Sequence, residues 1–289
     1  MLTKLAEFIY TKLFKPAPIR KLVNKIILVI LPSEVRYGNA IIKLNPSDPV
    51  VSGALLFHVY EREEISFLKN NLRSGDLFID IGANIGFYTA MAMQQVGKKG
   101  TVIALEPDPE SYRYLEQTID RNGPCDVRSF NVAASSSDGS ASLFKSESNR
   151  GDNRLHEFDN ASDKIEIKTV NVDSLVKRLL LNIVDKRVFI KIDIQGGEGL
   201  AIQGMKNILI DAKNLVLMME FWPQGLSNMQ SDPGLLLSTL EDAGLTLYEL
   251  GTKCRLISIN DKQRLINRLS GRKYTNIIGL KARKAPVNI

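Results

Sequence analysis

Residues 78–88 read Phe-Ile-Asp-Ile-Gly-Ala-Asn-Ile-Gly-Phe-Tyr, an apolar strand pattern that passes through a glycine-bearing turn into a helical pattern. This arrangement lets a ligand approach backbone amides at the carboxyl edge of a sheet. Gly82 has no side chain where such a ligand would pass, and Gly86 would let the helix pack closely on the strand. The segment therefore predicts an α/β fold with a ligand-binding crevice at the end of this strand.

The sequence on either side of this segment alternates short apolar runs with longer helical patterns. Such alternation is typical of β-α-β units that build a parallel sheet. The expected strands are 77–81, 101–105, 127–132, 188–192, 215–219, 245–250 and 276–280. The expected helices are 86–95, 109–122, 172–181, 198–210 and 233–243. We therefore predict a mostly parallel sheet with helices on both faces.

Two regions depart from this alternation. Residues 135–170 are rich in Ser, Asp and Asn around two alternating pieces, which predicts a β-hairpin inserted at the sheet edge. Residues 2–14 and 20–31 place apolar side chains at helical spacing, which predicts a helical N-terminal extension. We therefore divide the chain into an extension at 1–44 and an α/β domain at 45–289, in which residues 262–289 form a basic C-terminal segment.

The net charge of +6 is unevenly distributed along the 289 residues. Residues 1–36 carry +5, residues 262–289 carry +8, and the 225 residues between them carry −7. A groove for nucleic acid would be built from a basic body, so this distribution argues against a nucleic-acid partner. The basic N-terminal segment could contact an anionic membrane surface, pack on the body, or, like the C-terminal tail, simply be solvated.

Cysteine content and hydropathy bear on the location of the protein. Cys125 and Cys254 are too few for the disulfide framework of a secreted protein. The longest apolar run, residues 26–31, stops at Pro32 and is far shorter than the ~20 residues that span a bilayer. These features predict a cytoplasmic protein, with peripheral membrane contact if the basic N-terminal segment binds there.

The charges beside the glycine turn indicate which cofactor the crevice binds. A dinucleotide fingerprint has three glycines, but here Asn84 takes the middle position and Asp80 precedes the first glycine. A carboxylate would oppose a pyrophosphate but suits a sulfonium, so the pattern favours S-adenosylmethionine over NAD. Glu106 ends the next strand and could accept hydrogen bonds from both ribose hydroxyls.

The chain resembles FkbM-type S-adenosylmethionine-dependent methyltransferases over roughly residues 45–250. The ordered motifs that carry the resemblance are Tyr60-Glu61, residues 80–86, Glu106-Pro107, residues 191–198 (Lys-Ile-Asp-Ile-Gln-Gly-Gly-Glu) and residues 220–223 (Glu-Phe-Trp-Pro). The first glycine motif occurs across class I methyltransferases, whereas its pairing with the 191–198 motif is more specific. The resemblance implies a seven-stranded Rossmann-like sheet and methyl transfer, commonly to a hydroxyl oxygen of a sugar or natural product.

The resemblance also implies roles for single residues. It places the methionine part of the cofactor against Asp80, Gly82, Ala83 and Asn84, and the transferred methyl beside Asp193. It places the ribose against Glu106 and the adenine against residues 131–133, which include Asn131 and Ala133. The chain departs from the family pattern at Gln195, where an acid is common. Glu61 could meet the cofactor's amino group; as an alternative, it is one of several acids at a helix start.

Methyl transfer to an alcohol needs an acceptor oxygen in line with the methyl group and a base for its proton. Asp193 is the first candidate for the base, and Glu198 and Glu220 are the reserves. Glu198 could instead be a helix-start carboxylate. Lys191, two residues before Asp193, fits an ion pair with Asp80 or Glu220, or a group that orients the acceptor. Asp193, Glu198 and Glu220 could together hold a divalent metal, but we predict a site without one.

Two other classes of function compete with this interpretation. A nucleic-acid base methyltransferase would favour an Asp/Asn-Pro-Pro-aromatic segment where this chain has residues 193–196, Asp-Ile-Gln-Gly. A non-catalytic module on the same fold would not need the intact acids. Trp222 fits the core or rim, or a platform for a sugar ring. We predict a cytoplasmic class I methyltransferase that methylates a hydroxyl on a glycan precursor or secondary metabolite.

Overall fold

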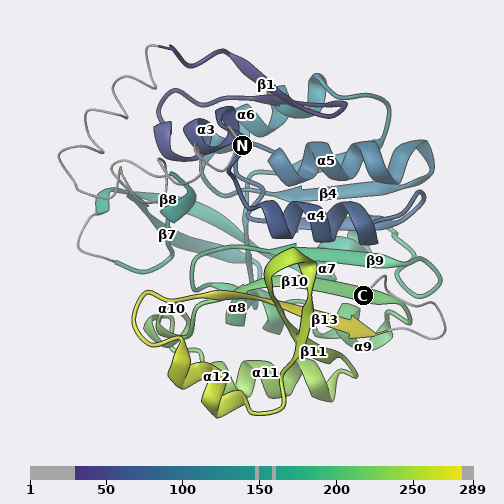
Figure 1. Ribbon diagram of the computed structural model, residues 1–289, viewed down its shortest axis with the longest axis vertical. Helices are drawn as coiled ribbons and strands as arrows, with labels where there is room; N and C mark the ends of the chain where they lie inside the picture. The colour runs from purple at the N-terminus through teal and green to yellow at the C-terminus, as the bar shows by residue number, and fades with distance from the viewer. Residues whose placement is uncertain (1–29, 147–149, 158–160, 282–289) are drawn as a thin grey trace.

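The computed structural model describes residues 30–146, 150–157 and 161–281, and a twisted central sheet runs through the middle of the molecule (Figure 1). Its strands lie in the order β12-β11-β13-β10-β9-β3-β4-β5. In that order their bounds are Leu256–Ser258, Thr246–Leu250, Thr275–Lys281, Leu215–Phe221, Val188–Ile192, Leu77–Ile81, Thr101–Leu105 and Asp126–Phe130. The run from β10 to β5 is parallel, and β13 is antiparallel to both of its neighbours.

This arrangement confirms the predicted α/β fold with a mostly parallel sheet. The described part of the sheet has eight strands rather than seven, because β12 pairs with β11 at one edge. The chain leaves β3 toward β4 and β5 and then returns to β9 on the other side of β3. Such a reversal of strand order opens a crevice at the carboxyl ends of the two strands, so β3 and β9 define where a ligand fits.

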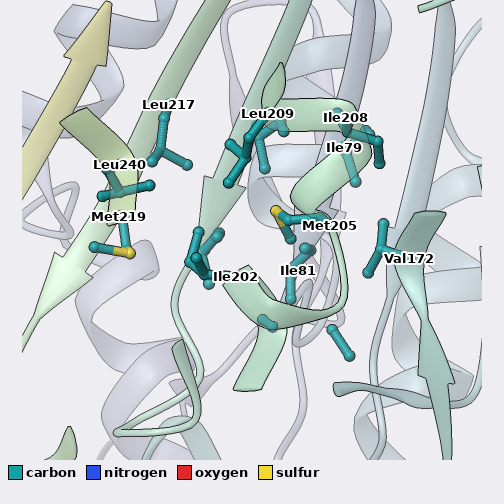
Figure 2. Close-up of a cluster of buried hydrophobic side chains, with 14 of the residues drawn as sticks. Ile79, Ile81, Val172, Ile202, Met205, Ile208, Leu209, Leu217, Met219 and Leu240 are labelled. Atoms are coloured by element: carbon teal, nitrogen blue, oxygen red, sulfur yellow. The ribbon is translucent and has the colours of Figure 1, made fainter. Parts of the chain in front are cut away.

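Helices cover both faces of the sheet because the strands bury side chains on both sides. On one face Phe78 and Phe189 pack against the helices α3 to α5; on the other, Ile79 and Ile81 pack against α7 to α9, as Figure 2 shows. The bounds are α3 Pro49–Leu56, α4 Arg62–Asn71, α5 Phe87–Val96, α6 Pro109–Asp120, α7 Val172–Arg178, α8 Glu198–Gln203, α9 Lys206–Asp211, α10 Pro223–Asn228, α11 Pro233–Asp242 and α12 Lys262–Arg268.

One expected helix, 198–210, is broken into α8 and α9. The break follows Gly204, where an added Cβ would lie 2.0 Å from the Ser135 carbonyl oxygen. The backbone at Ser135 thus lies too close to the backbone at Gly204 for a side chain to fit between them, and the helix ends there. This contact joins residues 69 positions apart in the sequence, so no local pattern indicates it.

The predicted hairpin is present but belongs to a separate sheet, not to the edge of the central one. β7 (Gly139–Ser146) pairs antiparallel with β8 (Ala161–Asn171), and β6 (Ala133–Ser135) pairs parallel with β8. The short β6 directly follows the end of β5, so this three-stranded sheet stands beside the carboxyl ends of the central strands (Figure 1). The insertion can therefore contribute residues to the crevice.

The two ends of the chain are described only in part. The helices predicted at 2–14 and 20–31 fall on residues 1–29, outside the described residues except for Ile30 and Leu31. The extension also contains a hairpin that the sequence did not indicate, β1 (Glu34–Tyr37) and β2 (Ala40–Lys43). In the C-terminal segment, α12 and β13 belong to the domain, and residues 282–289 lie outside the description. Among the helices described, none has the length and apolar character to cross a membrane.

Candidate active site

A cavity of about 400 Å³ lies at the carboxyl ends of β3, β4, β9 and β10. On what we call its β4 side it is lined by Tyr60, Glu61, Gly82, Ala83, Asn84, Glu106 and residues 132–134. On its β10 side it is lined by residues 151–155, Gln195, Glu220, Trp222, Arg272 and Tyr274. Lys191 and Asp193, from the end of β9, lie between the two sides because β9 stands between β3 and β10 in the sheet.

The cavity gathers most, but not all, of the predicted site residues. It is lined by Glu61, Gly82, Ala83, Asn84, Glu106, Ala133, Asp193 and Glu220. The four other predicted residues do not line the cavity; they are Asp80, Gly86, Asn131 and Glu198. Each contacts a residue that lines the cavity or a helix behind it.

The turn after β3 is shaped by close approaches of its backbone. Gly82 has a φ of +83°, and an added Cβ would lie 2.0 Å from the Asp193 carbonyl oxygen. The amides of Gly82 and Ala83 both donate to the Leu105 carbonyl at 3.0 Å. Gly86 has a φ of +86°, and its missing Cβ makes room for Leu115 of α6, not for the strand as the sequence suggested. The turn is thus wedged between β4, α6 and the loop that carries Asp193.

Asp80 lies behind the cavity instead of facing it. Its side chain is fully buried, and one oxygen accepts a hydrogen bond from the Thr89 hydroxyl at 2.7 Å. Burial raises the pKa of Asp80, and the nearby Lys191 ammonium opposes that rise. Because Asp80 lies behind the cavity, it can act on a bound cofactor only through neighbouring residues. Lys191 is such a neighbour, since the two residues are paired across β3 and β9.

Glu106 holds the end of β4 against the glycine turn. One carboxylate oxygen accepts from the Asn84 amide and the other from the Asp108 amide, both at 2.8 Å. Burial raises the pKa of Glu106 to about 8, and these two amides oppose the rise. The Asn131 side-chain amide donates to the carbonyls of Glu106 and Pro107, so Asn131 fixes this strand end and does not border the cavity.

This buried carboxyl group gives an expected pH dependence of folding stability. An unfolded chain releases the Glu106 proton near pH 4.5, whereas the folded protein keeps it to about pH 8. The stabilising contribution is therefore complete below pH 4.5 and is lost as the pH rises through about 8. We expect the melting temperature of the cofactor-free protein to fall over this range, and to fall less in Glu106→Gln.

The measurement is a pH series of thermal unfolding by circular dichroism. Glu166→Gln, which changes an exposed glutamate, is the control and should follow the unmodified protein. Equal pH slopes for Glu106→Gln and the control would show that Glu106 ionises normally in the folded state.

Lys191 is the buried cation at the centre of the site. Its ammonium lies 3.4 Å from an Asp193 oxygen and 4.5 Å from the centre of the Tyr88 ring. Burial alone would lower the pKa of Lys191, but Asp193, Asp80 and Glu61 together raise it, so the charge is retained. The predicted ion pair of Lys191 is therefore made with Asp193, not with Asp80 or Glu220.

Glu61 reaches the same cluster from the start of α4. It accepts a hydrogen bond from the Tyr88 hydroxyl at 2.6 Å, and burial raises its pKa to about 7, with Asp193 adding to the rise. Because Tyr88 stacks on Lys191, this chain of contacts connects Glu61 to Asp193. Glu61 is thus more than a surface acid at a helix start.

Gln195 joins two of the predicted catalytic carboxylates. Its side-chain amide nitrogen lies 3.1 Å from an oxygen of Asp193 and 3.1 Å from an oxygen of Glu220, and donates to both. Burial and then Asp193 raise the pKa of Glu220 well above its ordinary value. An acid at position 195 would repel both neighbours, so the amide keeps Asp193 and Glu220 close together.

Glu198 has a positioning role. Its oxygens accept hydrogen bonds from the backbone amides of Ile194 and Gly196 at 3.0 to 3.2 Å, and the side chain is fully buried. Burial raises its pKa to about 7, and these amides oppose the rise. Glu198 thus shapes the loop that carries Asp193 and Gln195 but does not reach the cavity. Within the described residues, no His, Cys, Asp and Glu side chains are grouped as three or more metal ligands.

Sequence reasoning missed three residues of the β10 side. Arg154 comes from the insertion, and Arg272 and Tyr274 precede β13, yet all three line the cavity with Trp222. The Trp222 indole donates to the Gly271 carbonyl at 2.8 Å, and the Arg154 guanidinium lies 4.7 Å from its ring centre. They carry no motif, and Arg154 is separated from Arg272 by 118 positions, so only the fold brings the insertion and the segment before β13 together.

Comparisons with known proteins agree with this description. A family model described as the methyltransferase FkbM domain matches residues 80–247, more than half of the chain. None of the curated proteins compared with the chain matches its sequence significantly.

Solved structures with a similar arrangement include fibrillarin from Aeropyrum pernix with bound S-adenosylmethionine, at 12% identity and TM-score 0.42, covering 75% of this chain and 74% of that one. Another is an S-adenosylmethionine-dependent methyltransferase from Aquifex aeolicus, at 13% identity and TM-score 0.40, covering 75% and 88%. The assignment rests on the family model, because these structural likenesses are distant. The chain belongs to the FkbM family of S-adenosylmethionine-dependent methyltransferases.

Proposed function

We propose that this methyltransferase transfers the methyl group to a hydroxyl oxygen of a sugar, a glycan precursor or another hydroxylated metabolite. The observation that carries the proposal is the position of Asp193, whose carboxylate lies between the β4 and β10 sides of one cavity. A carboxylate there can hold an acceptor hydroxyl and receive its proton. Trp222 lines the β10 side and supports the Arg154 guanidinium, which can donate to the polar groups of an acceptor.

The residues of the β4 side fit S-adenosylmethionine. Glu106 presents a carboxylate suited to the ribose hydroxyls, and the buried side-chain oxygen of Asn84 has no hydrogen-bond partner among the described residues. Glu61 and Asp193 place acidic groups where the chain would meet an ammonium or a sulfonium. Small residues at 82, 83 and 133 leave space for the adenosine.

The proposed chemistry is a single displacement. Bound S-adenosylmethionine supplies an electrophilic methyl carbon and a thioether leaving group. Asp193 orients the acceptor hydroxyl and takes its proton as the new C–O bond forms and the C–S bond breaks. Gln195 and Lys191, which contact the two oxygens of Asp193, hold its carboxylate in place. Glu106 and the glycine turn hold the cofactor and take no part in proton transfer.

The test is an assay with methyl-labelled S-adenosylmethionine and a panel of sugars, sugar conjugates and polyhydroxylated metabolites. We expect label in a product that survives mild alkali, as a methyl ether does, together with stoichiometric S-adenosylhomocysteine. Label released by mild alkali would indicate a methyl ester and would contradict O-methylation of a hydroxyl. Label transferred to nucleic acid would contradict the proposed acceptor class.

We also propose a cytoplasmic location, supported by Cys125 and Cys254, which are both free thiols. Peripheral membrane contact through the basic N-terminal segment is part of the same proposal and rests on the net charge of +5 in residues 1–36. Flotation with anionic vesicles, with and without residues 1–29, measures it. Equal flotation of the two chains would contradict a membrane role for this segment.

A further inference from the structure

Two arginines from distant parts of the chain, Arg154 and Arg272, line the same cavity as Trp222. The Arg154 guanidinium lies 4.7 Å from the centre of the indole ring, in the range of a cation–π contact. On its edge the indole donates to the Gly271 carbonyl at 2.8 Å, and the next residue is Arg272. Trp222 is 6% exposed, so it supports Arg154 directly and fixes the backbone next to Arg272 at the cavity wall.

The two arginines differ in their surroundings. Arg154 is 8% exposed and forms an ion pair with Asp152, which also lines the cavity. Arg272 is exposed, and within the described ranges it makes no ion pair or hydrogen bond. It lines the cavity all the same, so it places there a cation that has no counter-charge among the described residues.

The charged residues that line the cavity differ in their partners. Glu61 accepts a hydrogen bond from Tyr88, Glu106 accepts from two backbone amides, and Asp193 pairs with Lys191. On the β10 side, Asp152 is paired with Arg154, and Glu220 accepts a hydrogen bond from Gln195. Among the described residues that line the cavity, Arg272 therefore remains as the charged group without an ion pair or hydrogen bond, on the side where the acceptor would lie.

We infer that the methyl acceptor carries an anionic group, a phosphate or a carboxylate, which Arg272 binds together with Arg154 beside Trp222. The inference rests on the proposed function, since it places the acceptor on the β10 side. The planar guanidinium donates in parallel to two oxygens of such a group, so it fixes orientation as well as charge. With the anion held there, the rest of the acceptor extends toward Asp193, which lines the same cavity.

The experiment uses Trp222 as its own reporter, because it is the only tryptophan in the chain. The full-length protein, saturated with S-adenosylhomocysteine, is titrated with matched sets of glucose, galactose and mannose as the neutral sugar, the 1-phosphate and the uronate. We expect saturable changes in tryptophan fluorescence with one of the two anionic forms and much weaker binding of the neutral sugars. The anionic form that binds more tightly identifies phosphate or carboxylate as the recognised group.

Variants then assign the binding to Arg272. Arg272→Ala should weaken binding of the anionic sugar about 10-fold, and Arg272→Lys should weaken it less because it keeps the charge but loses the parallel donors. Lys273→Ala removes the same charge from the neighbouring exposed residue, which does not line the cavity, and should leave binding unchanged.

Three results would overturn the inference: equal binding of neutral and anionic sugars, no fluorescence response to any anionic sugar, or equal affinities of the Arg272→Ala and Lys273→Ala variants. A separate calorimetric titration with S-adenosylmethionine distinguishes failure of the inference about the acceptor from failure of the proposed function. If the cofactor binds but the anionic sugars do not, only the inference about the acceptor fails. If the cofactor itself does not bind, the proposed function fails.

Discussion

Asp193→Asn is expected to lower kcat by about 10²- to 10⁴-fold, the range for loss of a positioned general base. The amide keeps the size of the side chain and can still accept a hydrogen bond from Gln195, but it cannot receive a proton. Because we propose that Glu106 and the glycine turn hold the cofactor, affinity for S-adenosylmethionine should stay within a few-fold of the unmodified protein. Release of S-adenosylhomocysteine measures turnover, and calorimetry measures cofactor affinity.

Two further variants make this result specific. Glu220→Gln keeps the contact to Gln195 and should reduce turnover less than Asp193→Asn, since burial raises the pKa of Glu220 and we assign the role of base to Asp193. Asp185→Asn changes an exposed aspartate that contacts Lys213 at 3.7 Å and Asn182 at 3.1 Å, does not line the cavity, and should have no effect on turnover. Full turnover in Asp193→Asn with loss in Glu220→Gln would transfer the role of base to Glu220.

Gly82→Ala is expected to reduce both folding stability and cofactor binding. An added Cβ would lie 2.0 Å from the Asp193 carbonyl oxygen and 2.9 Å from Cγ2 of Ile194. The Asp193 carbonyl belongs to backbone, which cannot move alone because the Asp193 amide donates to the Ile81 carbonyl at 3.0 Å. Overpacking and a positive φ together should cost about 2–4 kcal/mol of the free energy of unfolding. Displacement of the turn should also abolish measurable cofactor binding.

Gly38→Ala is the matched control for this variant. Gly38 has a φ of +63°, but an added Cβ there would meet no atom within 4 Å. It therefore carries the backbone cost without the steric clash and should lose only about 1 kcal/mol. Denaturant unfolding and cofactor calorimetry compare the two. Equal losses in both variants would show that the approach of Gly82 to Asp193 has no energetic consequence.

The local sequence was sufficient for the central strands. Strands buried on both faces read as short apolar runs, and β3, β4 and β9 were predicted to the residue. The prediction missed the helices α3, α4, α10 and α12 and the short strands β1, β2, β6 and β12. It also missed the break between α8 and α9, which arises where Gly204 meets Ser135 and leaves no periodic signal in the sequence.

For the site, the sequence determined which residue types gather at the strand ends, because parallel strands bring their carboxyl ends to one edge. It could not separate residues that face the cavity from those behind it. Asp80 and Glu198 carry a carboxyl group as Asp193 does, but their side chains are buried against Thr89 and against the backbone amides of the 194–196 loop. That distinction depends on which way each side chain turns at the end of a strand, where strict alternation stops.

The sequence by itself determined the family, the α/β fold and an acidic crevice that suits a cationic cofactor, because these follow from contiguous motifs and strand order. The tertiary structure alone decided the bridge from Gln195 to two carboxylates and the placement of Arg154, Trp222 and Arg272 along one cavity. The physical reason is distance along the chain. Contacts between residues far apart in sequence form only when the insertion and the segment before β13 fold back over the same strand ends.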